Sequence, residues 1–284
     1  MAAPGAGWLT PLEAELFRGL LDLLLPRDCA VTGDPLDTGD FRHLSPAGAG
    51  RLERIADPRC ATCGHPFFGV LVAPRRCPHC VDLNPAFGRA VCAFRAKDEM
   101  RELIHRIKYR AEPWLAEDLA RVAIADPAFR RHLAGSTLVP VPLHGARRRE
   151  RGYNQAEVVA RSLAAHAPGC ECIDLLERTR DTGQQVRLGR AERVENMDDA
   201  FRIRPGMRVP RGRLVVVDDV LTTGATLSAC AAALLVGGAR RVDAAALART
   251  FAAPLAADMR AFALGRMGLS VDELDAALRA EGLS

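Results

Sequence analysis

Two adjacent carboxylates, Asp218 and Asp219, follow the apolar run Leu214–Val217 and precede a turn rich in threonine. The run predicts a buried strand of a parallel sheet. The acids then lie at the carboxyl end of that strand, where open α/β sheets bind ligands. Ionised carboxylates accept hydrogen bonds, so an adjacent pair can hold the vicinal hydroxyls of a sugar. The pair therefore indicates a site for a ligand that carries a diol.

The turn after the acids combines small residues with hydroxyl groups, just before a predicted helix. Its members are Thr222, Thr223, Gly224, Ala225 and Thr226. Free backbone amides at the amino terminus of a helix bind anions, and threonine hydroxyls add donors for phosphate oxygens. The acids and the turn together predict a site for a sugar phosphate.

Three other interpretations of an apolar strand that ends in two aspartates have to be weighed. A Walker B strand needs a partner loop GxxxxGK[ST], and neither lysine of the chain, Lys97 or Lys108, has that context. A receiver domain needs a lysine downstream of the acids, and none follows Lys108. A purely structural strand with a capped turn leaves the two carboxylates and the threonines unexplained.

A second polar segment follows a short predicted strand at residues 138–143. It holds four arginines in five positions, namely Arg147, Arg148, Arg149 and Arg151, and a helix is expected to begin near Asn154. Guanidinium groups bind phosphate in a bidentate manner. Such a cluster is most often a solvated surface, however, and can also bind nucleic acid. The cluster alone does not choose among these roles.

The cysteines supply a separate chemistry, because four of them form two CxxC pairs that residues 64–76 separate. They are Cys60, Cys63, Cys77 and Cys80. Four thiolates close a tetrahedral zinc site with no open position, which indicates a structural metal. A redox CxxC pair and four unrelated buried thiols are the alternatives. His65 and His79 lie beside the pairs as further possible ligands or as groups that support the ligands.

The overall composition bounds the class of protein. The 284 residues include 39 Lys+Arg against 35 Asp+Glu, and 49% are hydrophobic, which excludes disordered and collagen-like chains. A net charge of +4 is too small for nucleic-acid binding by the whole surface. No segment approaches the ~20 apolar residues that span a bilayer, and the amino terminus lacks a signal-peptide pattern. We expect a cytoplasmic protein without a membrane span. Because thiols stay reduced in the cytoplasm, we expect paired cysteines to hold metal.

The elements that must position these residues change in character along the chain. An amphipathic helix is expected between Thr10 and Pro26, and residues 101–124 predict helices interrupted at Pro113. After Cys92, strand-like runs alternate with helical patterns, which is typical of an α/β domain with a mainly parallel sheet flanked by helices. The expected organisation is a helix and irregular linker at 1–50, a zinc-ribbon module at 51–92, an α/β domain at 93–250 and a helical extension at 251–284.

These motifs carry a resemblance to a known family. Leu214–Thr226 is similar at every position to the signature for 5-phosphoribosyl 1-pyrophosphate (PRPP) in type I phosphoribosyltransferases. From about residue 26 to 250 the chain resembles the ComF family of competence-associated, phosphoribosyltransferase-like proteins. The pieces in the family's order are the CxxC pairs, Leu103–Arg110, Val139–Ala156, Arg178–Phe201 and the paired acids. The resemblance implies a type I phosphoribosyltransferase fold with a small zinc ribbon before it.

The resemblance also implies roles for matching positions. Asp218 and Asp219 would bind the ribose hydroxyls of PRPP, and the threonine turn would hold its 5-phosphate. The arginine loop would face the pyrophosphate together with Mg²⁺, and the segment from Arg178 to Asn196 would close over the site. The implied catalytic residues are Asp218, Asp219, Arg147 and Arg151. The implied PRPP-binding residues are Val217, Asp218, Asp219, Thr222, Thr223, Gly224, Ala225, Thr226, Arg178, Arg190 and Arg193.

The function that the resemblance implies is PRPP and Mg²⁺ binding by a protein associated with natural transformation, with phosphoribosyl transfer to an unidentified acceptor. The acceptor is expected near Met100–Trp114, where Lys108 and Tyr109 are candidates. Two alternatives stay open: an active phosphoribosyltransferase of nucleotide or purine salvage, and a PRPP sensor that binds single-stranded DNA or a DNA-uptake helicase without turnover. In the extension, Ser270 and Glu273 predict a capped helix for packing or homo-oligomer contacts.

Overall fold

A computed structural model of the chain describes residues 27–36, 41–67, 75–179, 200–250, 270 and 272–273. Its contacts divide the chain into two units, Met1–Leu52 and Glu53–Ser284. The helix predicted between Thr10 and Pro26 and most of the extension lie outside the described residues. In the parts that the structure describes, no helix has the length and apolar character needed to cross a membrane.

The first unit contributes one short described helix, α2 (Pro46–Gly50), which Ser45 caps by accepting a hydrogen bond from the amide of Gly48 at 2.9 Å. Cys29 is buried against this cap and accepts hydrogen bonds from the amide and the hydroxyl of Ser45, at 3.2 and 3.3 Å. Burial would raise the pKa of Cys29, but hydrogen bonds with Ser45 and Thr32 lower it to about 6. The thiol thus serves the local packing around α2.

The second unit is built on a five-stranded sheet in which all neighbouring strands are parallel. In spatial order its members are β1 (Ala90–Arg95), β7 (Val242–Arg249), β6 (Leu214–Leu221), β2 (Thr137–Pro140) and β3 (Glu171–Cys172). The central strands are buried on both faces, which explains their nearly continuous apolar sequences. The predicted α/β fold is confirmed, and its first strand begins just before the expected domain start at residue 93.

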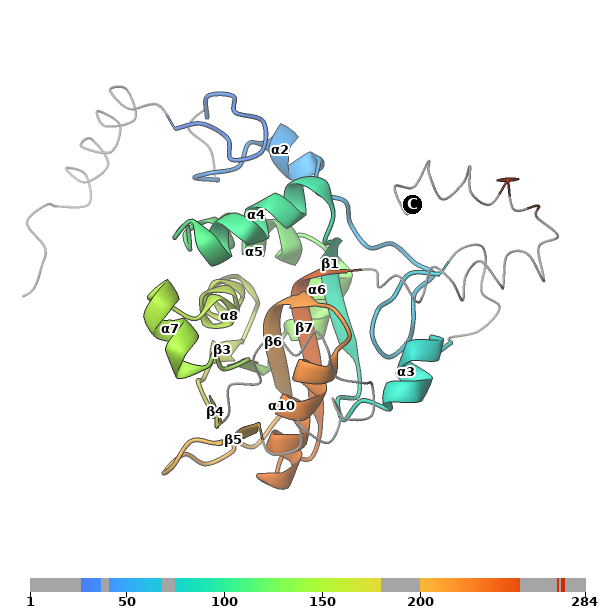
Figure 1. Cartoon of the computed structure of the whole chain (residues 1–284), viewed down its shortest axis with the longest axis vertical. Coiled ribbons are helices and arrows are strands. Elements are labelled where there is room, and N and C mark those ends of the chain that lie inside the picture. The colour runs from blue at the N-terminus through green and yellow to red at the C-terminus, as the bar shows by residue number, and fades with distance from the viewer. Residues whose placement is uncertain are drawn as a thin grey trace, which may run out of the picture. The chain divides into compact units, whose positions relative to one another are not determined.

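Helices cover the sheet. They are α4 (Asp98–Tyr109), α5 (Leu115–Ile124), α6 (Pro127–Leu133), α7 (Gly145–Arg151), α8 (Gln155–His166) and α10 (Ala225–Val236). Figure 1 shows α10 in front of β6 and β7, which it contacts. Helix α8 contacts β2 and β6, and α6 contacts β1. The gap between α4 and α5 contains Pro113, so the predicted interruption is confirmed.

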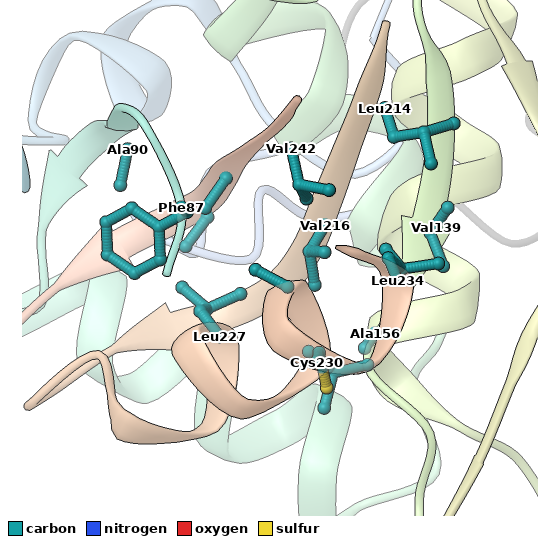
Figure 2. Packing of buried hydrophobic residues seen from close by; sticks show 14 of the residues in the cluster. Phe87, Ala90, Val139, Ala156, Leu214, Val216, Leu227, Cys230, Leu234 and Val242 are labelled. Carbon is teal, nitrogen blue, oxygen red and sulfur yellow. The ribbon is translucent and has the colours of Figure 1, made fainter. Parts of the chain in front are cut away.

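The core between α10 and the sheet follows the alternation of side chains along β6. Leu214 and Val216 belong to one buried cluster with Leu234 of α10 (Figure 2). Val215 and Val217 are equally buried but lie on the other face, because successive strand residues point in opposite directions. Packing on both faces holds the carboxyl end of β6 in place, and the candidate site begins there.

Two short strands outside this sheet form an antiparallel hairpin, β4 (Leu176–Arg178) and β5 (Phe201–Ile203). The amide of Thr179 donates to the carbonyl of Ala200 at 2.9 Å, so both ends of the intervening segment are close together. The predicted closing segment starts in β4. Residues 180–199, with Arg190 and Arg193, lie outside the described residues.

The carboxyl-terminal extension is described at only three positions. The amide of Ser270 donates to Oε2 of Glu273 at 2.9 Å, and the amide of Glu273 donates to Oγ of Ser270 at 3.3 Å. These reciprocal bonds are the capping box that the sequence predicts at this point.

Replacing Leu234 with alanine should lower the free energy of unfolding by about 2–5 kcal/mol, because the side chain is fully buried and its removal leaves a cavity. Val236→Ala on the same helix is the matched control. Val236 is 91% exposed, so its truncation should change stability by less than about 0.5 kcal/mol. Urea unfolding measures both, and equal losses would contradict the packing of α10 on the sheet.

Candidate active site and metal centre

A cavity of about 670 Å³ lies at the carboxyl ends of strands β1, β6 and β2. This is the edge at which open parallel sheets bind ligands. The predicted site residues that line the cavity are Asp218, Asp219, Thr222, Thr226, Arg147 and Arg178. The fold thus brings two acids, two threonines and two arginines from three separate segments of the chain into one space.

The two acids occupy different surroundings within the cavity. Asp218 is half-buried, and its Oδ1 accepts a hydrogen bond from the amide of Asp219 at 2.9 Å. Asp219 is 4% exposed. Strand β6 fixes both residues, since Val217 pairs with β2 and β7, and its carbonyl accepts a hydrogen bond from the amide of Val141 at 2.9 Å.

Lys108 of α4 supplies the counter-charge for this acid pair. Its Nζ lies 2.6 Å from Oδ2 of Asp219. Burial would lower the pKa of Lys108, but the carboxylate of Asp219 more than offsets this effect and raises it. Burial, followed by the charge of Asp219, raises the pKa of Asp218 well above its ordinary value. The site therefore presents one carboxyl group that readily holds a proton beside a second that is paired with an ammonium group.

The turn after β6 has the backbone geometry of an anion cradle. Gly224 precedes α10 with a φ of +82°, in the left-handed region that favours glycine. Oγ1 of Thr223 accepts a hydrogen bond from the amide of Ala225 at 3.4 Å. Thr222 and Thr226 line the cavity on either side of this bend. A helix amino terminus with threonine hydroxyls beside a cavity is a type of structure that binds anions.

The arginines that the sequence predicts in a loop lie instead on the short helix α7, which divides between the cavity and the surface. Arg147 is half-buried and lines the cavity, whereas Arg151 lies over the ring of Tyr109 with its guanidinium carbon 4.8 Å from the ring centroid. Asn154 caps α8, and its Nδ2 donates to the carbonyl of Val141 at 2.9 Å. These contacts fix both ends of the segment that contains α7. The helix that the sequence placed near Asn154 is confirmed as α8.

Besides Lys108, which the sequence analysis named as a candidate near the acceptor, the cavity contains polar residues that had no role there. Lys97 and Arg101 lie four residues apart at the start of α4, and Lys108 follows seven residues later, so one face of α4 forms a basic wall. This spacing of basic residues could have predicted the basic wall from the sequence. Gln155 gave no such signal: it is 8% exposed, lines the cavity, and its Oε1 has no hydrogen-bond partner among the described residues.

The four predicted cysteine ligands converge in the second unit, before β1. The sulfur atoms of Cys60, Cys63, Cys77 and Cys80 all lie within 4.8 Å of one another, and each residue is at most 2% exposed. The Sγ atoms of Cys63 and Cys77 are 3.6 Å apart, close to the ~3.8 Å of a tetrahedron with Zn–S bonds of ~2.3 Å. The amide of Cys77 donates to Sγ of Cys60 at 3.2 Å. The predicted cluster is confirmed, and its donor set suits a structural zinc ion.

The two histidines beside the cysteines have other contacts. His65 is buried and packs edge-on against Phe67, with ring centroids 6.3 Å apart, and burial lowers its pKa to about 4. His79 lies on α3 (Pro78–Leu83), and its Nε2 is 2.5 Å from the carbonyl oxygen of Thr223. A carbonyl only accepts, so Nε2 carries the proton. The cluster of possible metal ligands therefore consists of cysteines, and His79 contacts the threonine turn.

These features define the class of protein. The chain has a type I phosphoribosyltransferase fold. Its features are the parallel sheet, the acids and threonine turn at the end of β6, and the hairpin of β4 and β5. The four-cysteine module precedes it in the chain.

Comparison with known proteins gives the family. The chain is 33% identical over 233 residues to DNA utilization protein YhgH of Salmonella typhi. The aligned region covers 80% of this chain and 99% of that protein. It is 29% identical over 193 residues to competence protein F of Haemophilus influenzae, covering 66% and 84% of the two chains. Competence protein ComFC of Streptococcus pneumoniae is 32% identical over 111 residues, 39% and 47% of the two chains. No family model matches the chain. The chain belongs to the ComF family.

Metal analysis of the purified protein should find about one Zn²⁺ per chain. Cys60→Ser combined with Cys77→Ser should lose the metal, because two thiolates cannot complete the tetrahedral site. Cys172→Ser is the control, since this thiol lies on the edge strand β3 and outside the cluster. A wild type without zinc, or a double variant that keeps it, would contradict the assignment.

Proposed function

We propose that the protein binds PRPP in the cavity at the end of β6, together with Mg²⁺. The observation that carries the proposal is the convergence of three kinds of group in one cavity. The acids suit a ribose diol, the threonine turn suits a 5-phosphate, and Arg147 and Arg178 suit a pyrophosphate. No single ligand simpler than a phosphorylated sugar diphosphate uses all three.

In this proposal Asp218 and Asp219 hold the ribose hydroxyls, and the amides and hydroxyls of the threonine turn hold the 5-phosphate. Arg147 faces the pyrophosphate from helix α7, which follows β2, and Arg178 approaches from the hairpin. Carboxylate and phosphate oxygens are the donors that Mg²⁺ prefers, so the cavity also suits the metal that PRPP carries. When bound, Mg²⁺ supplies positive charge that stabilises the departing pyrophosphate.

The same arrangement is suited to phosphoribosyl transfer. The bond from C1 of the ribose to pyrophosphate breaks with its electron pair on the pyrophosphate, and an acceptor forms the new bond to C1. Such a displacement develops positive charge on the ribose and negative charge on the leaving group. Arg147 would stabilise the leaving group by fixed positive charge. The basic wall of α4 borders the space that is left for an acceptor.

We further propose that the protein acts in the uptake or use of DNA. Its relatives are named for competence and for DNA utilization, and a specific surface supports contact with single-stranded DNA. Helix α7 carries the exposed Arg148 and Arg149, and its Arg151 lies over the ring of Tyr109, which is 63% exposed. Cationic groups next to accessible aromatic rings bind single strands by stacking and by phosphate contacts.

PRPP binding is the direct test of the first proposal. Calorimetry with Mg²⁺ should detect binding by the wild type, and Asp218→Asn with Asp219→Asn should weaken it at least tenfold, because carboxyl groups that accept from the ribose hydroxyls are replaced by amides. The matched control is Asp28→Asn with Asp34→Asn, which removes two exposed carboxylates of the first unit. A wild type that does not bind PRPP, or equal effects in the two double variants, would refute the site.

Single-stranded DNA binding tests the second proposal. Affinity should fall steeply with salt, and Arg148→Ala with Arg149→Ala should weaken binding and lower the slope of that salt dependence, since phosphate contacts release counterions. The matched control removes another exposed adjacent pair, Arg130 and Arg131 of α6. Fluorescence anisotropy with an oligonucleotide measures both. Equal losses, or salt-independent binding, would contradict a defined surface on α7.

A further inference from the structure

The metal module contacts the threonine turn directly. His79 stands between the cluster residues Cys77 and Cys80, and its Nε2–H donates to the carbonyl of Thr223 at 2.5 Å. The Thr223 carbonyl belongs to the peptide that supplies the amide of Gly224, so the hydrogen bond from His79 orients that peptide. A residue between two metal ligands thus controls the orientation of the turn that we assign to the 5-phosphate.

Apolar side chains from the same module support the bend. At Gly224 a Cβ would lie 3.7 Å from Cζ of Phe87 and 3.8 Å from Cδ2 of Leu83, so both side chains pack against the glycine. Phe87 is 3% exposed and belongs to the core cluster of α10 (Figure 2). The turn therefore rests on the end of α3 and on the segment that follows it.

Two polar contacts extend the same connection. The amide of Ala86 donates to Oγ of Ser228, in the first turn of α10, at 2.9 Å. Arg249, at the end of β7, is 1% exposed and donates from Nη1 to the carbonyl of Cys63 at 3.1 Å. Thr250, which follows Arg249, lines the cavity. The module thus contacts both α10 and the end of β7, next to residues that line the cavity.

We propose that the four-cysteine site regulates PRPP affinity, and that His79 is the positioning residue that couples the two sites. The inference rests on the PRPP site proposed above. An anion cradle binds well only when its amides are already oriented, because ordering them on binding costs free energy. The metal fixes Cys77 and Cys80, and with them His79 and the start of α3. Loss of the metal releases the donor to Thr223, and the turn loses its fixed orientation.

The coupling must be reciprocal. If an occupied metal site strengthens PRPP binding by some factor, PRPP must strengthen metal binding by the same factor. Loading the phosphate turn should therefore protect the cysteine cluster from chelators. In a protein that stays folded without metal, a metal with no contact to the turn would show no such protection.

The first experiment tests His79 at constant metal content. His79→Ala should retain about one zinc per chain and bind PRPP about fivefold more weakly, the usual effect of losing one hydrogen bond. His79→Gln places an amide donor near the same position and should restore most of the affinity. His166→Ala is the matched control, because it removes a histidine contact of similar length, 2.6 Å to Glu117, elsewhere. It should leave PRPP affinity unchanged.

The second experiment measures reciprocity. Zinc affinity is determined by competition with a colorimetric chelator, with and without saturating PRPP and Mg²⁺. PRPP should strengthen zinc binding by the wild type, and it should strengthen zinc binding by His79→Ala to a smaller extent. The variant also controls for chelation of zinc by free PRPP. A wild type that fails to bind PRPP would refute the PRPP site itself. Normal PRPP binding that neither His79→Ala nor zinc removal changes, in a protein still folded by circular dichroism, would refute only the coupling.

Discussion

The ion pair between Lys108 and Asp219 is the interaction on which the arrangement of the site depends. A strand buried on both faces brings two carboxylates into a partly dry cavity, where an unpaired charge is costly. Lys108 offsets this cost at 2.6 Å, and in doing so it holds α4 beside the ends of the strands. Breaking a pair of this kind by removing one partner typically costs about 3–5 kcal/mol. The basic wall of α4 therefore follows from the burial of the acids.

The remaining elements of the site are held from two directions. On one side, Asn154 is bonded to Val141 and so fixes the ends of the segment that contains α7 and Arg147, which lines the cavity together with the acids. On the other side, the four-cysteine module contacts the turn through His79 and Phe87. The module is thus more than a separate small domain that precedes the sheet. It forms part of the support for the turn, and this explains how a short metal-binding segment and an α/β domain pack into one unit.

Much of the fold and site was predictable because the signals are local. The run before Asp218 predicts a strand that is buried on both faces. Pro113 prevents α4 and α5 from continuing as one helix, because proline has no amide hydrogen to donate and clashes with the carbonyl four residues before it. The CxxC spacing predicts a metal knuckle without knowledge of the fold. Contacts over long sequence separations were not predictable in this way. Nothing near Lys108 indicates that it meets Asp219, and the spacing of Arg147 and Arg151 does not show that one lines the cavity while the other lies over Tyr109.

The sequence by itself determined the class of fold, the acids and turn at the end of β6, the cysteine cluster and the family resemblance, because each depends on residue types at short, fixed spacing. Only the tertiary structure decided which cation neutralises the acids, which arginine reaches the cavity, and that His79 contacts the turn rather than joining the cysteine cluster. The physical reason is that the packing of helices on the sheet sets these distances, and packing sums many weak contacts from segments far apart in the chain.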